Sequence, residues 1–187
     1  LASVGEAFVF ESPAMKQIVG MVRRIAPIDA PVLITGRTGT GKEVVADLFH
    51  RYGRPGQPFV KINCAALPRE LIESELFGSA KGSFTGASTD RGGLFREAGD
   101  GTILLDEISE MPIETQAKLL RVLQDKEVRP VGGTKFYPIN CRVISSTNRL
   151  PEEAIRDGKL RQDLFYRVSA VRIHIPPLCE RREDIVL

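Results

Sequence analysis

The feature that most constrains the fold is a glycine-rich segment between an apolar run and an amphipathic stretch. Residues 36–43 read GRTGTGKE, follow the apolar run 31–35 (PVLIT) and precede residues 43–52, whose apolar positions have helical spacing. This order of strand, loop and helix is the context in which GxxxxGK binds phosphate. Glycines let the backbone wrap a phosphate closely, and N–H groups at the helix start add positive potential. The sequence therefore predicts a phosphate loop in which Lys42 reaches the β- and γ-phosphates of a nucleotide.

We assign nucleotide binding to the whole loop, namely Gly36, Arg37, Thr38, Gly39, Thr40, Gly41, Lys42 and Glu43. Glu43 stands where Ser or Thr usually ligates Mg²⁺ in this pattern, and that departure alone would leave a chance match open. The position of the loop between a strand-like run and an amphipathic helix argues against chance.

Five short apolar runs, each bounded by turn residues, predict strands at residues 31–35, 59–63, 102–106, 141–147 and 170–175. Three of these runs look buried on both faces of a sheet. Between them, apolar residues at three- and four-residue spacing predict helices at 15–25, 43–52 and 113–125. This alternation predicts an α/β fold with a mainly parallel five-stranded sheet flanked by helices and right-handed crossovers.

Composition excludes several classes of protein. The 26 basic and 24 acidic residues give a net charge of +2, which provides no electrostatic argument for nucleic-acid binding by this domain. The apolar runs are too short for a membrane helix, and no signal peptide is visible. Three cysteines without a CxxC pair argue against a disulfide framework or a zinc site and favour a reducing cytoplasm.

A pair of carboxylates ends the third apolar run, as in a Walker B segment. Asp106 would hold Mg²⁺, which prefers one or two carboxylates together with phosphate oxygens. Glu107 would polarise the attacking water, since a protein that only binds nucleotide needs no base. Two acids at a strand end could simply be solvated, but together with the phosphate loop they predict ATP hydrolysis.

Three further residues fit an ATPase. Asn148 follows the fourth run, where an amide could orient water or sense the γ-phosphate, or could merely serve a turn. Arg161 and Arg167 flank a short helical segment, and the planar fork of arginine stabilises a transferring phosphoryl group well. A solvated or salt-bridged arginine is the commoner alternative.

Residues 78–93 (GSAKGSFTGASTDRGG) fit neither a helical nor a strand period. They contain five glycines and one large apolar residue, Phe84. A lone aromatic side chain on such a loop either docks on a partner or tucks back onto its own core. Composition alone leaves both possibilities open.

Over essentially its whole length the chain resembles the central AAA+ ATPase domain of bacterial sigma-54-dependent transcription activators. The most specific match is Gly82, Ser83, Phe84, Thr85, Gly86 and Ala87, which resemble the GAFTGA hexapeptide of that family with Ser83 in place of Ala. The family also ends its phosphate loop in GKE, so Glu43 is expected. Further matching segments are FVKINCAA (59–66), GTILLDEI (101–108), DLFYRV (163–168) and PPLCERREDI (176–185).

The resemblance implies a role for the hexapeptide and for the polar residues around the phosphates. Phe84 and Thr85 would lie at the tip of a loop that contacts sigma-54. Asn63 would hold Glu107 in a switch that follows the γ-phosphate, and Asn148 would be the first sensor.

The resemblance also implies assembly into a ring, in which two arginines outside the loop would act. Arg161 and Arg167 would be arginine fingers that reach the ATP of a neighbouring subunit, so hydrolysis would depend on assembly into a hexamer. Residues 1–187 would form the AAA+ α/β subdomain alone. A sensory domain would precede it, and the helical lid and a DNA-binding helix-turn-helix domain would follow Leu187.

These matches predict a domain that hydrolyses ATP with Mg²⁺ and remodels the closed promoter complex of sigma-54 RNA polymerase. Two alternatives remain at this point. One is an AAA+ remodelling ATPase that acts on another client, and the other is a module that uses nucleotide only to set its oligomeric state.

Overall fold

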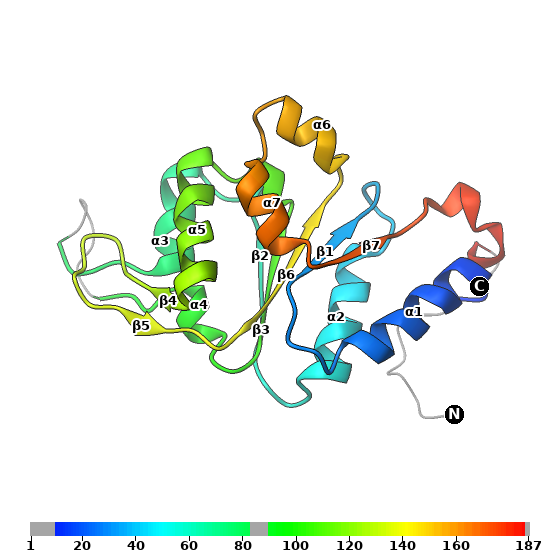
Figure 1. Cartoon of the computed structure of the whole chain (residues 1–187), viewed down its shortest axis with the longest axis horizontal. Helices are drawn as coiled ribbons and strands as arrows, with labels where there is room; N and C mark the ends of the chain where they lie inside the picture. The colour runs from blue at the N-terminus through cyan, green and yellow to red at the C-terminus, as the bar shows by residue number, and fades with distance from the viewer. Residues whose placement is uncertain (1–9, 83–89, 186–187) are drawn as a thin grey trace.

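The centre of the structure is a parallel five-stranded sheet with helices on both faces (Figure 1). The computed structural model describes residues 10–82 and 90–185. Across the sheet, the strand order is β2 (Phe59–Asn63), β3 (Thr102–Asp106), β6 (Arg142–Thr147), β1 (Val32–Thr35) and β7 (Val171–His174). Each neighbouring pair is parallel, as alternation of strands and helices predicts.

Side chains that alternate along the strands supply two separate cores. Val32 and Ile34 belong to the core shared with α1 (Pro13–Ile25) and α2 (Lys42–Gly53). Leu33 belongs to the opposite core, shared with α3 (Arg69–Phe77), α5 (Ile113–Asp125) and α7 (Gln162–Val168). A strand in the middle of the sheet must therefore be apolar on both faces, which explains the uninterrupted apolar runs.

The structure confirms the five predicted strands, which end within a residue of their expected bounds. The three inner strands β1, β3 and β6 are almost entirely buried, whereas the outer strands β2 and β7 are partly exposed. The three predicted helices are also present as α1, α2 and α5.

Several short elements were not predicted. They are α3, α4 (Leu94–Glu97), α6 (Pro151–Arg156), three 3₁₀ turns, η1 (Ile108–Glu110), η2 (Leu178–Glu180) and η3 (Arg182–Asp184), and a hairpin of β4 (Glu127–Val128) and β5 (Tyr137–Pro138). The two strands of the hairpin have two residues each, too few to show a period.

The glycine-rich segment 78–93 is closed at its base by backbone contacts. Ser79 and Arg91 exchange N–H···O bonds of 3.1 and 2.9 Å, and Ala80 N–H donates to the Val131 carbonyl at 2.9 Å. Gly93 has a φ of +71°, and a Cβ there would lie 2.3 Å from the Gly78 nitrogen. The two ends of the segment therefore approach more closely than residues with side chains allow. Residues 83–89, which include the predicted tip Phe84 and Thr85, lie outside the described residues.

Candidate functional site

The phosphate loop joins β1 to α2 at the carboxyl end of the sheet, beside the ends of β3 and β6 (Figure 1). This edge of a parallel α/β sheet is the usual place for a ligand. Gly41 precedes α2 with a φ of +92°, a region that L side chains rarely adopt. At Gly36, a Cβ would lie 2.8 Å from the carbonyl oxygen of Ile175, the residue after β7, so the backbone there leaves no room for a side chain.

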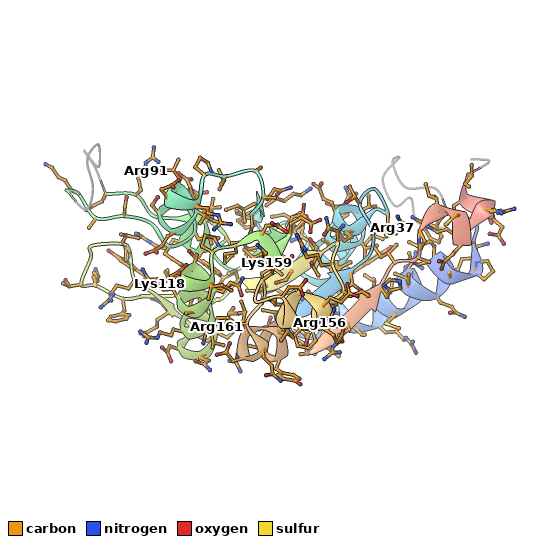
Figure 2. All side chains as sticks on the ribbon, turned by 90° about the horizontal axis from the view of Figure 1, so that it is seen from above. Arg37, Arg91, Lys118, Arg156, Lys159 and Arg161 are labelled. Atoms are coloured by element: carbon orange, nitrogen blue, oxygen red, sulfur yellow. The ribbon has the colours of Figure 1, made fainter. Side chains whose placement is uncertain are left out.

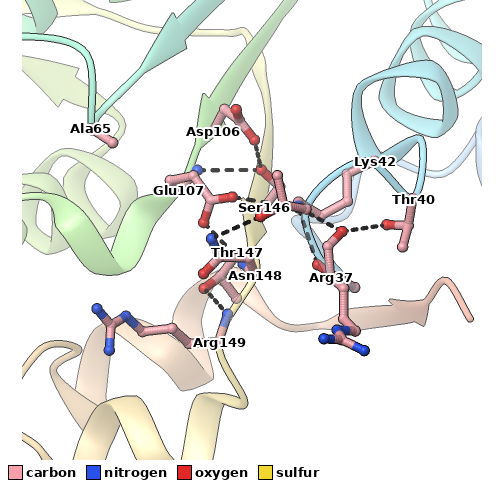
Figure 3. A network of polar contacts seen from close by, with 12 residues as sticks. Arg37, Thr40, Lys42, Ala65, Asp106, Glu107, Ser146, Thr147, Asn148 and Arg149 are labelled. Carbon is pink, nitrogen blue, oxygen red and sulfur yellow. Dashed lines mark hydrogen bonds and ion pairs between the residues drawn. The ribbon is translucent and has the colours of Figure 1, made fainter. Parts of the chain in front are cut away.

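Lys42, the first residue of α2, turns its side chain back under the loop (Figure 3). Its Nζ donates to the Gly36 carbonyl at 3.0 Å and to the Arg37 carbonyl at 3.4 Å. The same Nζ lies 3.4 Å from Oε1 of Glu107, and both side chains are nearly buried. The predicted loop cation and the predicted base are therefore neighbours.

Glu107 follows β3 in an unusual backbone conformation. Its φ of +54° and ψ of +53° are left-handed, which costs a non-glycine residue on the order of 1–2 kcal/mol. While Oε1 faces Lys42, Oε2 accepts a hydrogen bond of 2.9 Å from the Asn148 N–H. Such strain persists where surrounding contacts fix it, and it is common at functional sites.

Asp106 is held by donors from both neighbouring strands. Ser146 Oγ on β6 donates to Asp106 Oδ1, and Asn63 Nδ2 on β2 donates to Asp106 Oδ2 at 3.2 Å. Ser146 Oγ also accepts from the Glu107 N–H at 3.4 Å (Figure 3). The Ser146 hydroxyl group thus contacts both residues of the acidic pair.

The expected contact between Asn63 and Glu107 is replaced by the contact between Asn63 and Asp106. The cause is the strand register, because Asn63 is the Cα partner of Asp106 across β2 and β3. Glu107 lies one residue beyond β3, in the left-handed conformation, and its carboxylate faces Lys42 and the Asn148 N–H instead. The Asn63 Oδ1 atom accepts from the Ala65 N–H at 2.9 Å, which anchors the amide.

Asn148 lies beside the phosphate loop, as predicted. Its Nδ2 donates to Thr38 Oγ1 at 3.4 Å, and its backbone is tied to Glu107. Within the loop, Thr40 Oγ1 donates to the Arg37 carbonyl at 2.8 Å. The end of β6, the end of β3 and the loop thus form one connected polar network (Figure 3).

The side chain of Glu43 points away from this network. It forms an ion pair of 2.6 Å with Lys61 on β2, and its side chain is 63% exposed. In this structure, the Glu43 carboxylate is therefore directed at Lys61 and is not part of the polar network around Lys42.

The two candidate arginine fingers are not part of this network within one chain. Arg161 forms a two-pronged ion pair with Asp163, at 3.0 and 2.7 Å, at the start of α7. That contact raises the pKa of Arg161 and lowers the pKa of Asp163. Arg167 donates to the Leu123 carbonyl at 2.7 Å. Figure 2 shows Arg161 well away from Arg37, which marks the phosphate loop.

The residues at the site fit a Mg²⁺ ion bound together with phosphate. The described residues contain no group of three or more His, Cys, Asp or Glu side chains that could hold a metal by themselves. A P-loop site needs only one or two carboxylates, with phosphate and water oxygens completing the shell. The oriented carboxylate of Asp106 meets that requirement.

Cys64 lies next to Asp106, whose carbonyl accepts from the Cys64 N–H at 2.9 Å, but its thiol does not add a nucleophile. Burial, reinforced by the nearby charges of Asp106 and Glu107, raises the pKa of its thiol to about 12. The thiol therefore remains protonated at neutral pH.

Sequence reasoning missed Ser146, although a signal was present. Residues 145–147 read Ser-Ser-Thr and end a buried strand, where unpaired hydroxyl groups would be costly. The hydroxyl groups of Ser146 and Thr147 have partners, namely Asp106 and Ser109, whereas the buried Ser145 hydroxyl has none among the described residues.

Comparison with known proteins is consistent with the geometry. The sequence profile of the family described as "Sigma-54 interaction domain" matches residues 8–174. The chain belongs to this family. The regulatory protein AtoC of Escherichia coli is 51% identical over 94% of the chain, and the transcriptional regulatory protein FlbD of Caulobacter vibrioides is 48% identical over 95%. The resemblance drawn from the hexapeptide and the loop is confirmed at the level of the family.

The fold of this sigma-54 interaction domain is also found in a solved structure. NtrX from Brucella abortus, solved in complex with ATP, superposes with a TM-score of 0.88 at 41% identity over 97% of the chain. The predicted P-loop AAA+ fold is confirmed. The chain spans 38% of AtoC, 39% of FlbD and 41% of the NtrX chain.

Among the described residues, no helix has the length and apolar character needed to span a membrane.

Proposed function

We propose that this domain hydrolyses ATP with Mg²⁺ and, as a ring, uses the cycle to remodel the closed promoter complex of sigma-54 RNA polymerase. The observation that carries the proposal is the cluster of Lys42, Asp106, Glu107 and Asn148 around one loop. A cation, an acidic pair and an amide at the carboxyl edge of the sheet are the groups that phosphoryl transfer requires.

Binding begins with the loop. The backbone N–H groups of residues 39–43 and the start of α2 provide positive potential for the β-phosphate. Lys42 lies under the loop and reaches the β- and γ-phosphates. Asp106 would hold Mg²⁺, which would supply positive charge to offset the charge that develops during transfer.

Hydrolysis depends on the groups around the γ-phosphate. Glu107 orients and polarises the attacking water, and the backbone contact with Asn148 fixes the Glu107 carboxylate. The amide of Asn148, which donates to Thr38, would contact the γ-phosphate. Electrostatic stabilisation of this kind acts through groups already oriented before the reaction.

Arg161 and Arg167 complete the site from a neighbouring subunit of the ring. Both arginines lie away from the loop of their own chain, Arg161 at the N-cap of α7 and Arg167 within α7, which packs against α5. To act as a finger, Arg161 exchanges its solvent-exposed ion pair with Asp163 for phosphate oxygens, and solvent screening keeps that exchange easy. Hydrolysis then requires assembly into a hexamer.

The loop between Ser79 and Arg91 is the part of the domain that would act on its partner protein. Its stem is fixed by the backbone contacts of Ser79, while Phe84 and Thr85 would engage sigma-54. The DNA contacts of the whole protein would come from a separate domain, since the charge of this domain is only +2.

Replacement of Glu107, the proposed base, tests the assignment of ATP hydrolysis to this domain. Glu107→Ala is expected to retain ATP binding and to abolish steady-state release of phosphate in the full-length protein. The control is Glu110→Ala, which removes an acid three residues away that pairs with Arg149 at 3.0 Å. Normal turnover by Glu107→Ala would refute the role of Glu107. Hydrolysis by the wild type without any effect on sigma-54 would assign the ATPase to another client.

A further inference from the structure

Arg181 is a buried arginine that joins the segment after β7 to the phosphate loop. It is 4% exposed, and its guanidinium donates to three acceptors. One terminal nitrogen donates to the Thr40 carbonyl at 2.7 Å, and Nε donates to the Pro176 carbonyl at 3.1 Å. The other terminal nitrogen lies 3.4 Å from Oδ2 of Asp184. The five donors of arginine have a fixed geometry, so these contacts define the position of the whole group.

Asp184 extends this connection to the start of α1. Its Oδ1 accepts from the N–H groups of Glu11 and Ser12 at 2.7 and 2.8 Å, and its Oδ2 accepts from Ser12 Oγ at 2.7 Å. Ser12 is the N-cap of α1. Burial opposes the charge of Asp184, but the hydrogen bonds from Ser12 and Glu11 and the charge of Arg181 hold its pKa below the usual carboxyl range. The carboxylate is therefore ionised and paired at neutral pH.

The contact with Thr40 determines how one peptide of the loop is oriented. The peptide bonds of the described residues are trans, so the Thr40 carbonyl and the Gly41 N–H point in opposite directions. With the carbonyl held by Arg181, the Gly41 N–H is directed away from Arg181. A charged donor on the carbonyl also polarises the peptide and strengthens its N–H as a donor.

Glycine at position 41 makes such an external contact necessary. Gly41 has a φ of +92° and reaches other backbone regions at little cost, so its own conformation does not fix the direction of the preceding peptide. The Thr40 hydroxyl is engaged with the Arg37 carbonyl and does not restrain the Thr40 carbonyl. Arg181 supplies the restraint.

We propose that Arg181 and Asp184 are positioning residues for the phosphate loop. Arg181 orients the Thr40–Gly41 peptide so that the Gly41 N–H faces the phosphates, and Asp184 anchors Arg181 to the start of α1. The inference rests on the proposed function, because it describes how the same site is made ready for a nucleoside polyphosphate. Neither residue touches the ligand.

The experiment is calorimetric titration of the chain with ADP, combined with thermal unfolding of each variant. Arg181→Ala is expected to weaken ADP binding about tenfold, in line with the loss of a hydrogen bond from a charged donor. Arg181→Lys retains the positive charge but lacks the planar guanidinium group, and it should give an intermediate affinity for ADP. Asp184→Asn retains the size of the side chain but removes an acceptor, and it should weaken binding in the same direction as Arg181→Ala.

The matched control is Arg54→Ala. Arg54 also binds carbonyl oxygens, those of Asp100, Gly101 and Asn140 at 2.5, 3.0 and 2.7 Å, and it pairs with Asp29 at 2.8 Å. It lies at the opposite end of the sheet from the phosphate loop. Arg54→Ala is expected to lower the melting temperature and to leave the affinity for ADP unchanged.

The outcomes separate this inference from the function on which it rests. If the wild type binds ADP and Arg181→Ala binds equally well, the positioning role is wrong and the proposed function stands. If Arg54→Ala and Arg181→Ala lose the same affinity for ADP, general destabilisation of the domain explains both losses. That result would also overturn the positioning role. If the wild type binds no ADP, the proposed function fails, and this inference fails with it.

Discussion

Replacement of Lys42 by Met is expected to abolish most of the affinity for nucleotide without unfolding the domain. The Lys42 side chain is 8% exposed, and its three acceptors lie within 3.4 Å. Methionine fills nearly the same volume, so the loop keeps its packing. A hydrogen bond to a charged group contributes about 1.5–3 kcal/mol, which corresponds to roughly a tenfold to hundredfold loss of affinity.

The assay for Lys42→Met is a titration with a non-hydrolysable ATP analogue, with circular dichroism as the check on folding. Lys61→Met is the matched control, because Lys61 pairs with Glu43 and both side chains are largely exposed, at 43% and 63%. Such pairs contribute about 0–1 kcal/mol, and this one lies outside the polar network. A folded Lys42→Met protein that binds the analogue within twofold of the wild type would refute the phosphate role of Lys42.

Three further predictions follow from single contacts. Glu43→Ala should leave nucleotide affinity within about twofold of the wild type in the same titration, since its exposed carboxylate pairs with Lys61. A large loss of affinity would place the Glu43 side chain on the ligand. Phe49→Ala, in the core between α2 and the sheet, should lower the free energy of unfolding by about 3–5 kcal/mol in urea, and a change below about 1 kcal/mol would contradict the packing. The wild type should be more stable than Asp184→Asn at neutral pH. Because the folded-state pKa of Asp184 is lowered, this difference is present above the unfolded pKa of about 3.9 and disappears as the pH falls through the folded pKa, whereas a pH-independent difference would contradict it.

The sequence was sufficient to predict the sheet because the sheet is buried on both faces. Runs such as 102–106 and 31–35 could be read as strands from composition alone, and their order along the chain implied parallel pairing. The hairpin β4–β5 could not be predicted, since two residues per strand carry no periodic signal. Its position is fixed by contacts with distant segments, such as that between Ala80 and Val131.

The functional site shows the same contrast between residues in local motifs, which could be predicted, and long-range contacts, which could not. Lys42, Asp106 and Glu107 lie in local motifs, and the structure brings them together as the motifs predict. The partner of Asn63 depends on strand register, which no local pattern specifies. Arg181 contacts a loop residue that lies 141 positions earlier in the chain, so its role becomes visible only once the fold is known.

The measurement that tests the central claim most directly is binding of the full-length protein to sigma-54 in the presence of an ADP–metal-fluoride complex. Gel filtration of the mixture, with and without the nucleotide mimic, would be compared for the wild type and Thr85→Ala. The account predicts a complex that requires the mimic, is absent for Thr85→Ala and leaves the nucleotide affinity of that variant intact. A mimic-dependent complex that Thr85→Ala retains, or no complex from a protein that hydrolyses ATP, would contradict it.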